Sequence, residues 1–171
     1  PDRDMRRLAV TRREVIAAMP PLPETVAPLA AARGLVLARP VVAPHSVPPF
    51  ANSGVDGFAV RSVDTGPAPV ELEVIDDLPA GSFPTKAVSA GTAIRIMTGA
   101  PFPPGADAVV MVEDTAMVGD RVKVLRPVAP GAYVRPAGGD VAAGSVVLDQ
   151  GDRLGPAHLG VLASIGMASP M

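Results

Sequence analysis

The chain has 171 residues, enough for one domain or two small ones, and 48% of them are apolar although only 3% are aromatic. Its net charge of −2 and pI near 5.6 argue against a general nucleic-acid binder, and the absence of cysteine excludes disulfides and thiolate metal sites. No apolar run approaches the roughly 20 residues of a membrane span, and the N-terminus lacks the apolar segment of a signal peptide, so we expect a cytoplasmic protein.

Two short helices are predicted near the N-terminus. Residues 11–14 (Thr-Arg-Arg-Glu) have the form of a capping box followed by an apolar run, which indicates a helix start. Pro20 and Pro21 would end that helix, and Gly34 is the residue type that commonly follows a helix end. The two predicted helices cover about 12–19 and 28–33.

The pattern then turns to short strands. Residues 70–75 alternate apolar and acidic side chains, as a half-buried strand does. Gly119-Asp120 between two apolar runs is a hairpin signal, and Pro40 indicates an edge strand. The predicted strands are 35–42, 57–61, 70–75, 92–97, 108–112, 115–118, 122–125 and 145–148.

The last predicted element is a helix with Pro156 in its first turn and Gly166 as its terminator. Helices thus lie at both ends of the chain, with strands between them. We therefore predict a mainly β fold with a few short helices (α+β). In this fold a β-rich domain, residues 45–130, is inserted into a small linker module formed by 1–44 and 131–171.

Three glycine-marked turns carry the side chains best suited to chemistry. In the first, residues 48–57, two prolines stiffen the backbone and two glycines permit dihedrals forbidden to other residues. Asn52, Ser53 and Asp56 offer hydrogen-bond donors and acceptors within this tight segment. An Asp-Gly pair is also a common purely structural turn, so the residues alone leave both interpretations open.

The second turn follows a predicted strand at Thr98-Gly99. Its hydroxyl and backbone N–H groups suit an anion, although the segment lacks the lysine of a P-loop. The third turn spans 135–140, where Arg135 could hold a phosphate and Asp140 a divalent cation. A proline-stiffened loop and a solvated turn are the structural alternatives for these two segments.

Common catalytic motifs are missing from the sequence. His45 and His158 are too far apart to form a metal motif, and each is expected to be a surface or capping residue. The sequence has no zinc-protease helix motif, nucleophile elbow or dinucleotide fingerprint. The chemistry implied by the residues is therefore the holding of anions and cations.

Taken together, four ordered segments resemble the N-terminal half of the molybdopterin molybdenumtransferase family, which includes bacterial MoeA and the E domain of gephyrin. The resemblance runs from about residue 8 to the C-terminus. The segments that carry it are 48–61 (PPFANSGVDGFAVR), 90–101 (AGTAIRIMTGAP), 105–113 (GADAVVMVE) and 134–144 (VRPAGGDVAAG).

The resemblance implies an elongated homodimer that inserts molybdate into adenylated molybdopterin and releases AMP, with Mg²⁺ as cofactor. Family members have a linker domain, an inserted β-rich second domain, a third domain that binds molybdopterin and a small fourth domain. This chain resembles the first two domains only, so we expect no activity from it alone. No nucleic-acid or membrane partner is expected.

Three residues match positions associated with activity in the family: Asp56 in its S-A-M-D-G-Y segment, Thr98 in its T-G-A-P segment and Asp140 in its G-E-D segment. The family's site lies between the second domain of one subunit and the third domain of its partner. The resemblance thus predicts Asp56, Thr98 and Asp140 as catalytic residues, with both aspartates as Mg²⁺ ligands. Arg135 and Ser53 are the predicted substrate-binding residues.

The sequence departs from the family at several of these positions. Ala51 stands where Asp is usual, Gly54-Val55 replace Ala-Met, Phe58 replaces Tyr and Gly139 replaces Glu. Two acidic groups and one hydroxyl are therefore absent. This leaves an alternative function, a divergent module of the same family that dimerises or binds without catalysis.

Overall fold

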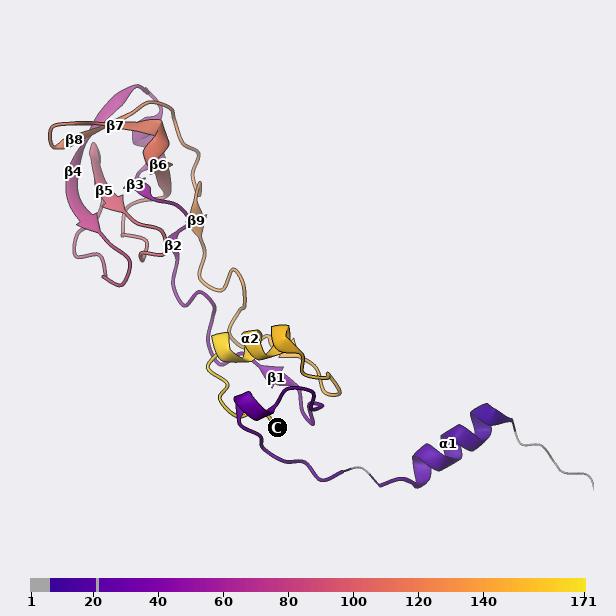
Figure 1. Cartoon of the computed structure of the whole chain (residues 1–171). Helices are drawn as coiled ribbons and strands as arrows, with labels where there is room; N and C mark the ends of the chain where they lie inside the picture. Colours follow the sequence, from indigo (N-terminus) through magenta and orange to yellow (C-terminus); the bar gives the residue numbers. More distant parts are fainter. Residues whose placement is uncertain (1–6, 21) are drawn as a thin grey trace, which may run out of the picture.

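The computed structural model describes residues 7–20 and 22–171. The chain is mainly β with two α-helices, as predicted, and its largest sheet, of six strands, is curled (Figure 1). Helical segments are α1 (Leu8–Ala18), η1 (Leu29–Ala31), η2 (Ser62–Thr65), η3 (Val112–Asp114) and α2 (Pro156–Ser164). The strands are β1 (Val41–Val42), β2 (Asn52–Ser53), β3 (Gly57–Val60), β4 (Val70–Leu78), β5 (Thr92–Ile96), β6 (Ala108–Met111), β7 (Thr115–Val118), β8 (Arg121–Val124), β9 (Val134–Arg135) and β10 (Val146–Leu148).

Six strands form one sheet in the order β6-β3-β5-β4-β8-β7. The β4–β5 pair is parallel and the other pairs are antiparallel. All four residues of β3 are buried, because this strand is covered on both faces. Alternate residues therefore enter different apolar clusters: Phe58 and Val60 lie in one and Ala59 in the other. Both clusters consist of aliphatic side chains almost throughout, as the low aromatic content requires.

A separate core is built from both ends of the chain. The strands β1 and β10 pair there, and α2 lies beside β1 (Figure 1). The buried Leu162 of α2 belongs to the same apolar cluster as Val41 and Leu148. Each fully buried aliphatic side chain contributes about 1.5–3 kcal/mol to stability. His158 accepts a hydrogen bond from the Gly155 amide at the start of α2, so it is a capping residue. The buried members of this cluster are Ala32, Leu37, Val41, Ala43, Leu148, Leu154, Leu162 and Ile165.

The strands β2 and β9 connect these two parts of the molecule (Figure 1). Asn52 pairs with Arg135 and Ser53 with Val134. Neither strand is in the predicted set, because a two-residue strand has no detectable alternation. The domain boundaries 45–130, 1–44 and 131–171 remain a prediction.

The helix α1 differs from its prediction and stands apart from both cores (Figure 1). It begins at Leu8 with Arg7 as its N-cap, so the predicted start at residue 12 is wrong. Thr11 lies inside the helix, where its amide donates to the Arg7 carbonyl at 3.2 Å, so its hydroxyl does not cap the helix end. None of the residues of α1 is buried. No helix in the described ranges is long and apolar enough to cross a bilayer.

Other boundaries were predicted with uneven success. The predicted strand 35–42 is wrong over most of its length, because strand pairing there is limited to β1 and an isolated bridge at Val36. The predicted helix 28–33 is reduced to the single turn η1. The β7–β8 hairpin is confirmed, with Val118 opposite Arg121 across Gly119-Asp120.

Candidate functional site

One edge of the six-stranded sheet brings the first two predicted turns together. Gly57 at the start of β3 pairs with Ile96 at the end of β5 and with Met111 at the end of β6. Ile96 also pairs with Leu78 at the end of β4. Four strands therefore begin or end at the same edge. Asp56, next to Gly57, and Thr98, which follows β5, are placed at this edge by the register.

The Asp56 carboxylate is held by Thr98 at two points. The Thr98 amide nitrogen lies 2.7 Å and the hydroxyl 2.6 Å from the same carboxylate oxygen, Oδ1. These two hydrogen bonds, the side-chain one first, lower the pKa of Asp56 below its ordinary value, and the positive charge of Arg95 adds to the effect. Asp56 is therefore an exposed, ionised carboxylate in a fixed orientation, and within the described part of the chain Thr98 donates to Oδ1 and not to Oδ2.

The segment that carries Asp56 is fixed by its backbone. The Asp56 carbonyl accepts a hydrogen bond from the Val112 amide at 3.2 Å, and the Gly54 amide donates to the Tyr133 carbonyl at 2.8 Å. A side chain at Gly57 has no room, because its Cβ would lie 2.0 Å from the Val110 carbonyl oxygen. Gly57 thus permits the close approach of β3 to β6 that sets the position of Asp56.

Ser53 is placed differently from the other predicted site residues. Its side chain is fully buried, and its hydroxyl donates to the Val55 carbonyl and accepts from the Val55 amide. This is the hydrogen bonding of a turn residue, directed inward. Its substrate-binding role stays a prediction, and the geometry gives the hydroxyl a structural task instead.

The Thr98 loop packs on β2. The Gly99 amide donates to the Ser53 carbonyl at 2.8 Å, and the Phe102 amide donates to the Ala51 carbonyl at 2.8 Å. Gly99 has a φ of +83°, a conformation that other residues rarely adopt. Before Thr98, the Met97 amide donates to the Leu78 carbonyl at 3.2 Å, so the loop is anchored on both sides of Thr98 and its two donors stay aimed at Asp56.

The third predicted turn forms an ion pair of its own. Arg135 Nη2 lies 2.9 Å from Asp140 Oδ2, and both side chains are about half exposed. Across the described ranges no hydrogen bond joins this pair to Asp56 or Thr98. The two pairs nevertheless belong to one region, because a Cβ at Gly54 would lie 3.6 Å from Arg135 Cγ.

The aspartates do not by themselves make a complete metal site. Among residues 7–20 and 22–171 there is no cluster of three or more acidic or histidine side chains that could hold an ion. Mg²⁺ often binds through one or two carboxylates and completes its shell with water and substrate phosphates. Asp56, with Oδ2 available, fits that mode, whereas Asp140 already neutralises Arg135.

Sequence reasoning noted Asn52 among the donors and acceptors of the first turn but gave it no role in the site, although it contacts all three turns. It is buried, pairs with Arg135 in β9 and forms an isolated bridge with Pro101 of the Thr98 loop. Its Oδ1 is a buried oxygen that no described group satisfies. The signal in the sequence was its place beside Ser53 in a stiffened turn, but nothing there showed that Asn52 joins all three turns.

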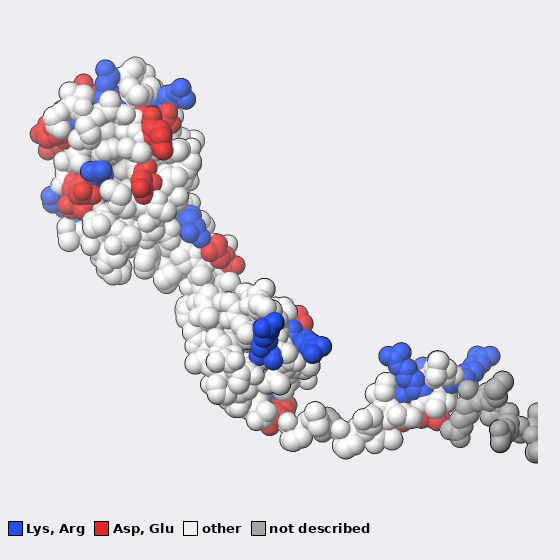
Figure 2. Space-filling model, viewed as in Figure 1, with Lys and Arg blue, Asp and Glu red and all other residues white. Residues whose placement is uncertain are grey.

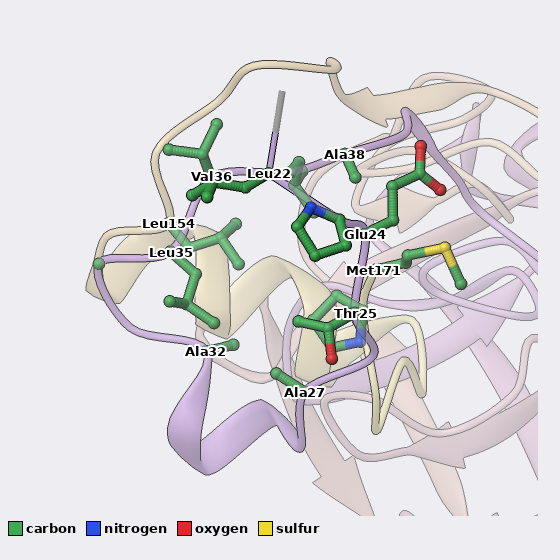
Figure 3. A pocket seen from close by; sticks show the side chains of 14 residues that line it. Leu22, Glu24, Thr25, Ala27, Ala32, Leu35, Val36, Ala38, Leu154 and Met171 are labelled. Carbon is green, nitrogen blue, oxygen red and sulfur yellow. The ribbon is translucent and has the colours of Figure 1, made fainter. Parts of the chain in front are cut away.

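Two hollows lie outside the Asp56–Thr98 pair. One, of about 340 Å³, is lined by the end of β6 and by residues 126–133, including Arg126 and Tyr133. The other, of about 450 Å³, is an apolar groove on the part built from the chain ends, lined by side chains such as Leu22, Leu35 and Val36 (Figure 3). Charges of both signs are interspersed over the six-stranded part on the face shown in Figure 2.

Comparison with known proteins gives consistent matches. Residues 7–166 match the family model described as the MoeA N-terminal region, domains I and II. The chain is 45% identical to molybdopterin molybdenumtransferase 2 of Mycobacterium tuberculosis over 96% of its own length and 42% of that protein. It is 41% identical to the molybdopterin molybdenumtransferase of Staphylococcus aureus over 78% of this chain and 33% of that protein.

Solved structures agree with these matches. A crystal structure of the molybdopterin biosynthesis moeA protein from Pyrococcus horikoshii OT3 superposes with a TM-score of 0.83 at 41% identity. That match covers 85% of this chain and 40% of the other. This chain therefore spans less than half the length of the relatives to which it is similar.

Proposed function

The chain belongs to the MoeA N-terminal region family, and from this premise we propose that it supplies one wall of the active site of a molybdopterin molybdenumtransferase. The proposed reaction of the whole protein inserts molybdate into adenylated molybdopterin and releases AMP. The observation that carries the proposal is the Asp56–Thr98 pair, an oriented and ionised carboxylate at an open sheet edge. A domain outside this chain, from a partner subunit, would supply the molybdopterin-binding wall.

In this proposal Asp56 is the residue that meets the ligand. Its ionised carboxylate is fixed through Oδ1, which leaves Oδ2 available to a ligand. Mg²⁺ bound there would neutralise charge on the pyrophosphate of the adenylated substrate. Thr98 uses both its amide and its hydroxyl proton on Asp56, so it acts as a positioning residue in this geometry rather than as a donor to the substrate.

The Arg135–Asp140 pair is proposed to orient an anionic group beside this carboxylate. Arg135 has five N–H donors and uses one nitrogen on Asp140, so further donors remain for a phosphate oxygen or for molybdate. Asp140 fixes the direction of the guanidinium. A role for Asp140 as a second Mg²⁺ ligand would require it to release Arg135.

The alternative is a binding module of the same family without catalysis. Ala51 and Gly139 favour it, because the family usually carries acidic side chains at both positions. The two functions differ in one measurable respect. If the site is catalytic, Asp56→Asn in the full-length parent should lower AMP release from adenylated molybdopterin about 100-fold. If the module only binds, the wild-type parent itself should release no AMP.

We also propose that the protein forms a homodimer through the part built from the chain ends. The apolar residues of α1 are exposed, including Val15 and Ile16, and an apolar groove lies beside Leu35 and Val36 (Figure 3). An isolated helix of 11 residues is marginal in water, so α1 requires a packing partner. Pro20, directly after the C-cap of α1, restricts the backbone where the helix leaves toward the core, which favours a second copy as that partner.

A further inference from the structure

Two aromatic side chains lie together on the surface of the six-stranded part. Phe50 and Phe83 have ring centroids 5.8 Å apart at an interplanar angle of 66°, an edge-to-face contact. Phe83 is 71% exposed and Phe50 37%, whereas Phe58 is 3% exposed in the core. The chain has only four phenylalanines, so half of them are placed at one exposed point.

This aromatic pair lies at the same sheet edge as Asp56 and Thr98. Phe83 belongs to the β4–β5 connection, which leaves the sheet after Leu78, and Leu78 pairs with Ile96 just before Thr98. Strands in a sheet are about 4.8 Å apart, so β4 lies about 10 Å from β3, which follows Asp56. Phe50 is also close to this edge, because the carbonyl of the next residue, Ala51, accepts a hydrogen bond from the Phe102 amide of the Thr98 loop.

The connection that carries Phe83 is held in place on both sides. Before it, the Ser82 amide donates to the Pro79 carbonyl in a turn. After it, Thr85 donates to Asp76 at 3.4 Å and Lys86 Nζ donates to the Ile75 carbonyl at 2.6 Å. The exposure of Phe83 is therefore a property of an anchored loop that presents an aromatic ring.

We propose that Phe83, supported by Phe50, stacks against the planar nitrogen heterocycle of a ligand whose phosphates lie at Asp56. This inference rests on the proposed function, whose substrate has two such ring systems, an adenine and a pterin, linked through phosphate groups. The edge-to-face contact uses only part of the two rings and leaves ring surface of Phe83 open to a flat partner. Stacking of a base on an aromatic side chain changes affinity by about ten-fold or more.

The test labels this chain with 4-fluorophenylalanine and follows its four ¹⁹F resonances. Single Phe→Leu variants assign the signals, and the labelled protein is titrated with AMP in one arm and with a soluble pterin in the other. The expected result is a saturable shift of the Phe83 and Phe50 signals in at least one arm, with Phe58 and Phe102 unchanged. The arm that responds identifies the heterocycle. Shifts in neither arm, or equal shifts at all four positions, would overturn the proposal.

A second measurement separates stacking from a change in folding. Phe83→Leu should weaken binding of the responding compound by about ten-fold, and Phe83→Trp should retain it, because Trp keeps a flat aromatic face. Equal loss in both variants would count against stacking. In parallel, Mg²⁺ and pyrophosphate are added while the ¹⁵N amide signals of Asp56 and Thr98 are observed. Amide shifts without a Phe83 response refute the aromatic subsite alone, whereas unchanged AMP release in full-length Asp56→Asn refutes the proposed function.

Discussion

The amide and hydroxyl of Thr98 both donate to Oδ1 of Asp56, at 2.7 and 2.6 Å, although the two residues are 42 positions apart in the chain. The pairing of Gly57 with Ile96 in adjacent strands brings them together. Thr98 thus holds Oδ1 of the carboxylate and does not bond to Oδ2. This contact leads to predictions about the pKa of Asp56, the pH dependence of stability and the activity of the full-length parent.

The first prediction concerns the pKa of Asp56. Thr98→Val removes the hydroxyl donor, so the pKa of Asp56 should rise toward its ordinary value of 3.8. A ¹³C carboxyl titration by NMR measures this directly. Thr92→Val is the matched control, because the Thr92 hydroxyl bonds within its own turn to Ser89. An unchanged Asp56 titration in Thr98→Val would show that the hydroxyl hydrogen bond does not set the pKa.

The same contact predicts the sign of a pH effect on stability. The pKa of Asp56 is lower in the folded chain than its ordinary value of 3.8, so the folded state holds this proton less tightly than the unfolded state. The contact therefore stabilises the fold above that pH, and the stabilisation is lost as the pH falls through the lowered pKa. Urea unfolding at pH 7 and pH 3 should show a smaller loss for Asp56→Asn than for the wild type.

The second prediction concerns activity in the full-length parent. Asp56→Asn removes the charge but keeps the size of the side chain, and AMP release should fall about 100-fold, as for the loss of a preorganised electrostatic contact. AMP release by Thr98→Val should fall by a smaller factor, because the backbone amide of residue 98 still orients Asp56. Asp120→Asn, in the β7–β8 turn, is the control with the same chemical change. Equal turnover in Asp56→Asn and Asp120→Asn would contradict the catalytic proposal.

A third prediction tests the ion pair of the third turn. Arg135 and Asp140 are about half exposed, so their coupling energy in a double-mutant cycle of Arg135→Gln and Asp140→Asn should be about 1 kcal/mol or less. In the full-length parent, however, either single variant should weaken binding of molybdate or adenylated molybdopterin. A large stability coupling with unchanged binding would make the pair a structural element only.

The sequence was sufficient for the fold class and for much of the strand pattern, because alternation in segments such as β4 is a local property. It failed where pairing with distant segments decides the structure. The apolar residues 35–38 have only an isolated bridge in place of a strand, and β2 and β9 are too short to show a period. The three turns were found by their glycines. Which of their side chains meet depends on the β3–β5 register, and no pattern in the sequence indicated that Ser53 faces inward.

A fourth prediction concerns Gly57 and the approach of β3 to β6. A Cβ at position 57 would lie 2.0 Å from the Val110 carbonyl oxygen, so Gly57→Ala must displace backbone and should destabilise the six-stranded part by about 3 kcal/mol or more. Gly160→Ala is the control, because a Cβ there meets nothing within 4 Å and the residue lies in α2. That variant should stabilise its helix by about 1 kcal/mol. Chemical unfolding measures both changes, and similar values for the two variants would contradict the close contact at Gly57.

The last prediction concerns self-association. If α1 packs on a second copy, Ile16→Asp should shift the equilibrium toward monomer. Ile16 is apolar and 59% exposed in the single chain, and a charged side chain at this position would have to be buried in the dimer. Val36→Asp at the groove should have the same effect, because both surfaces belong to the proposed interface. Val63→Asp, at an exposed apolar position of η2 in the six-stranded part, is the control. Sedimentation equilibrium over a range of concentrations measures the dimer fraction, and a wild-type chain that stays monomeric throughout would refute the homodimer for these residues.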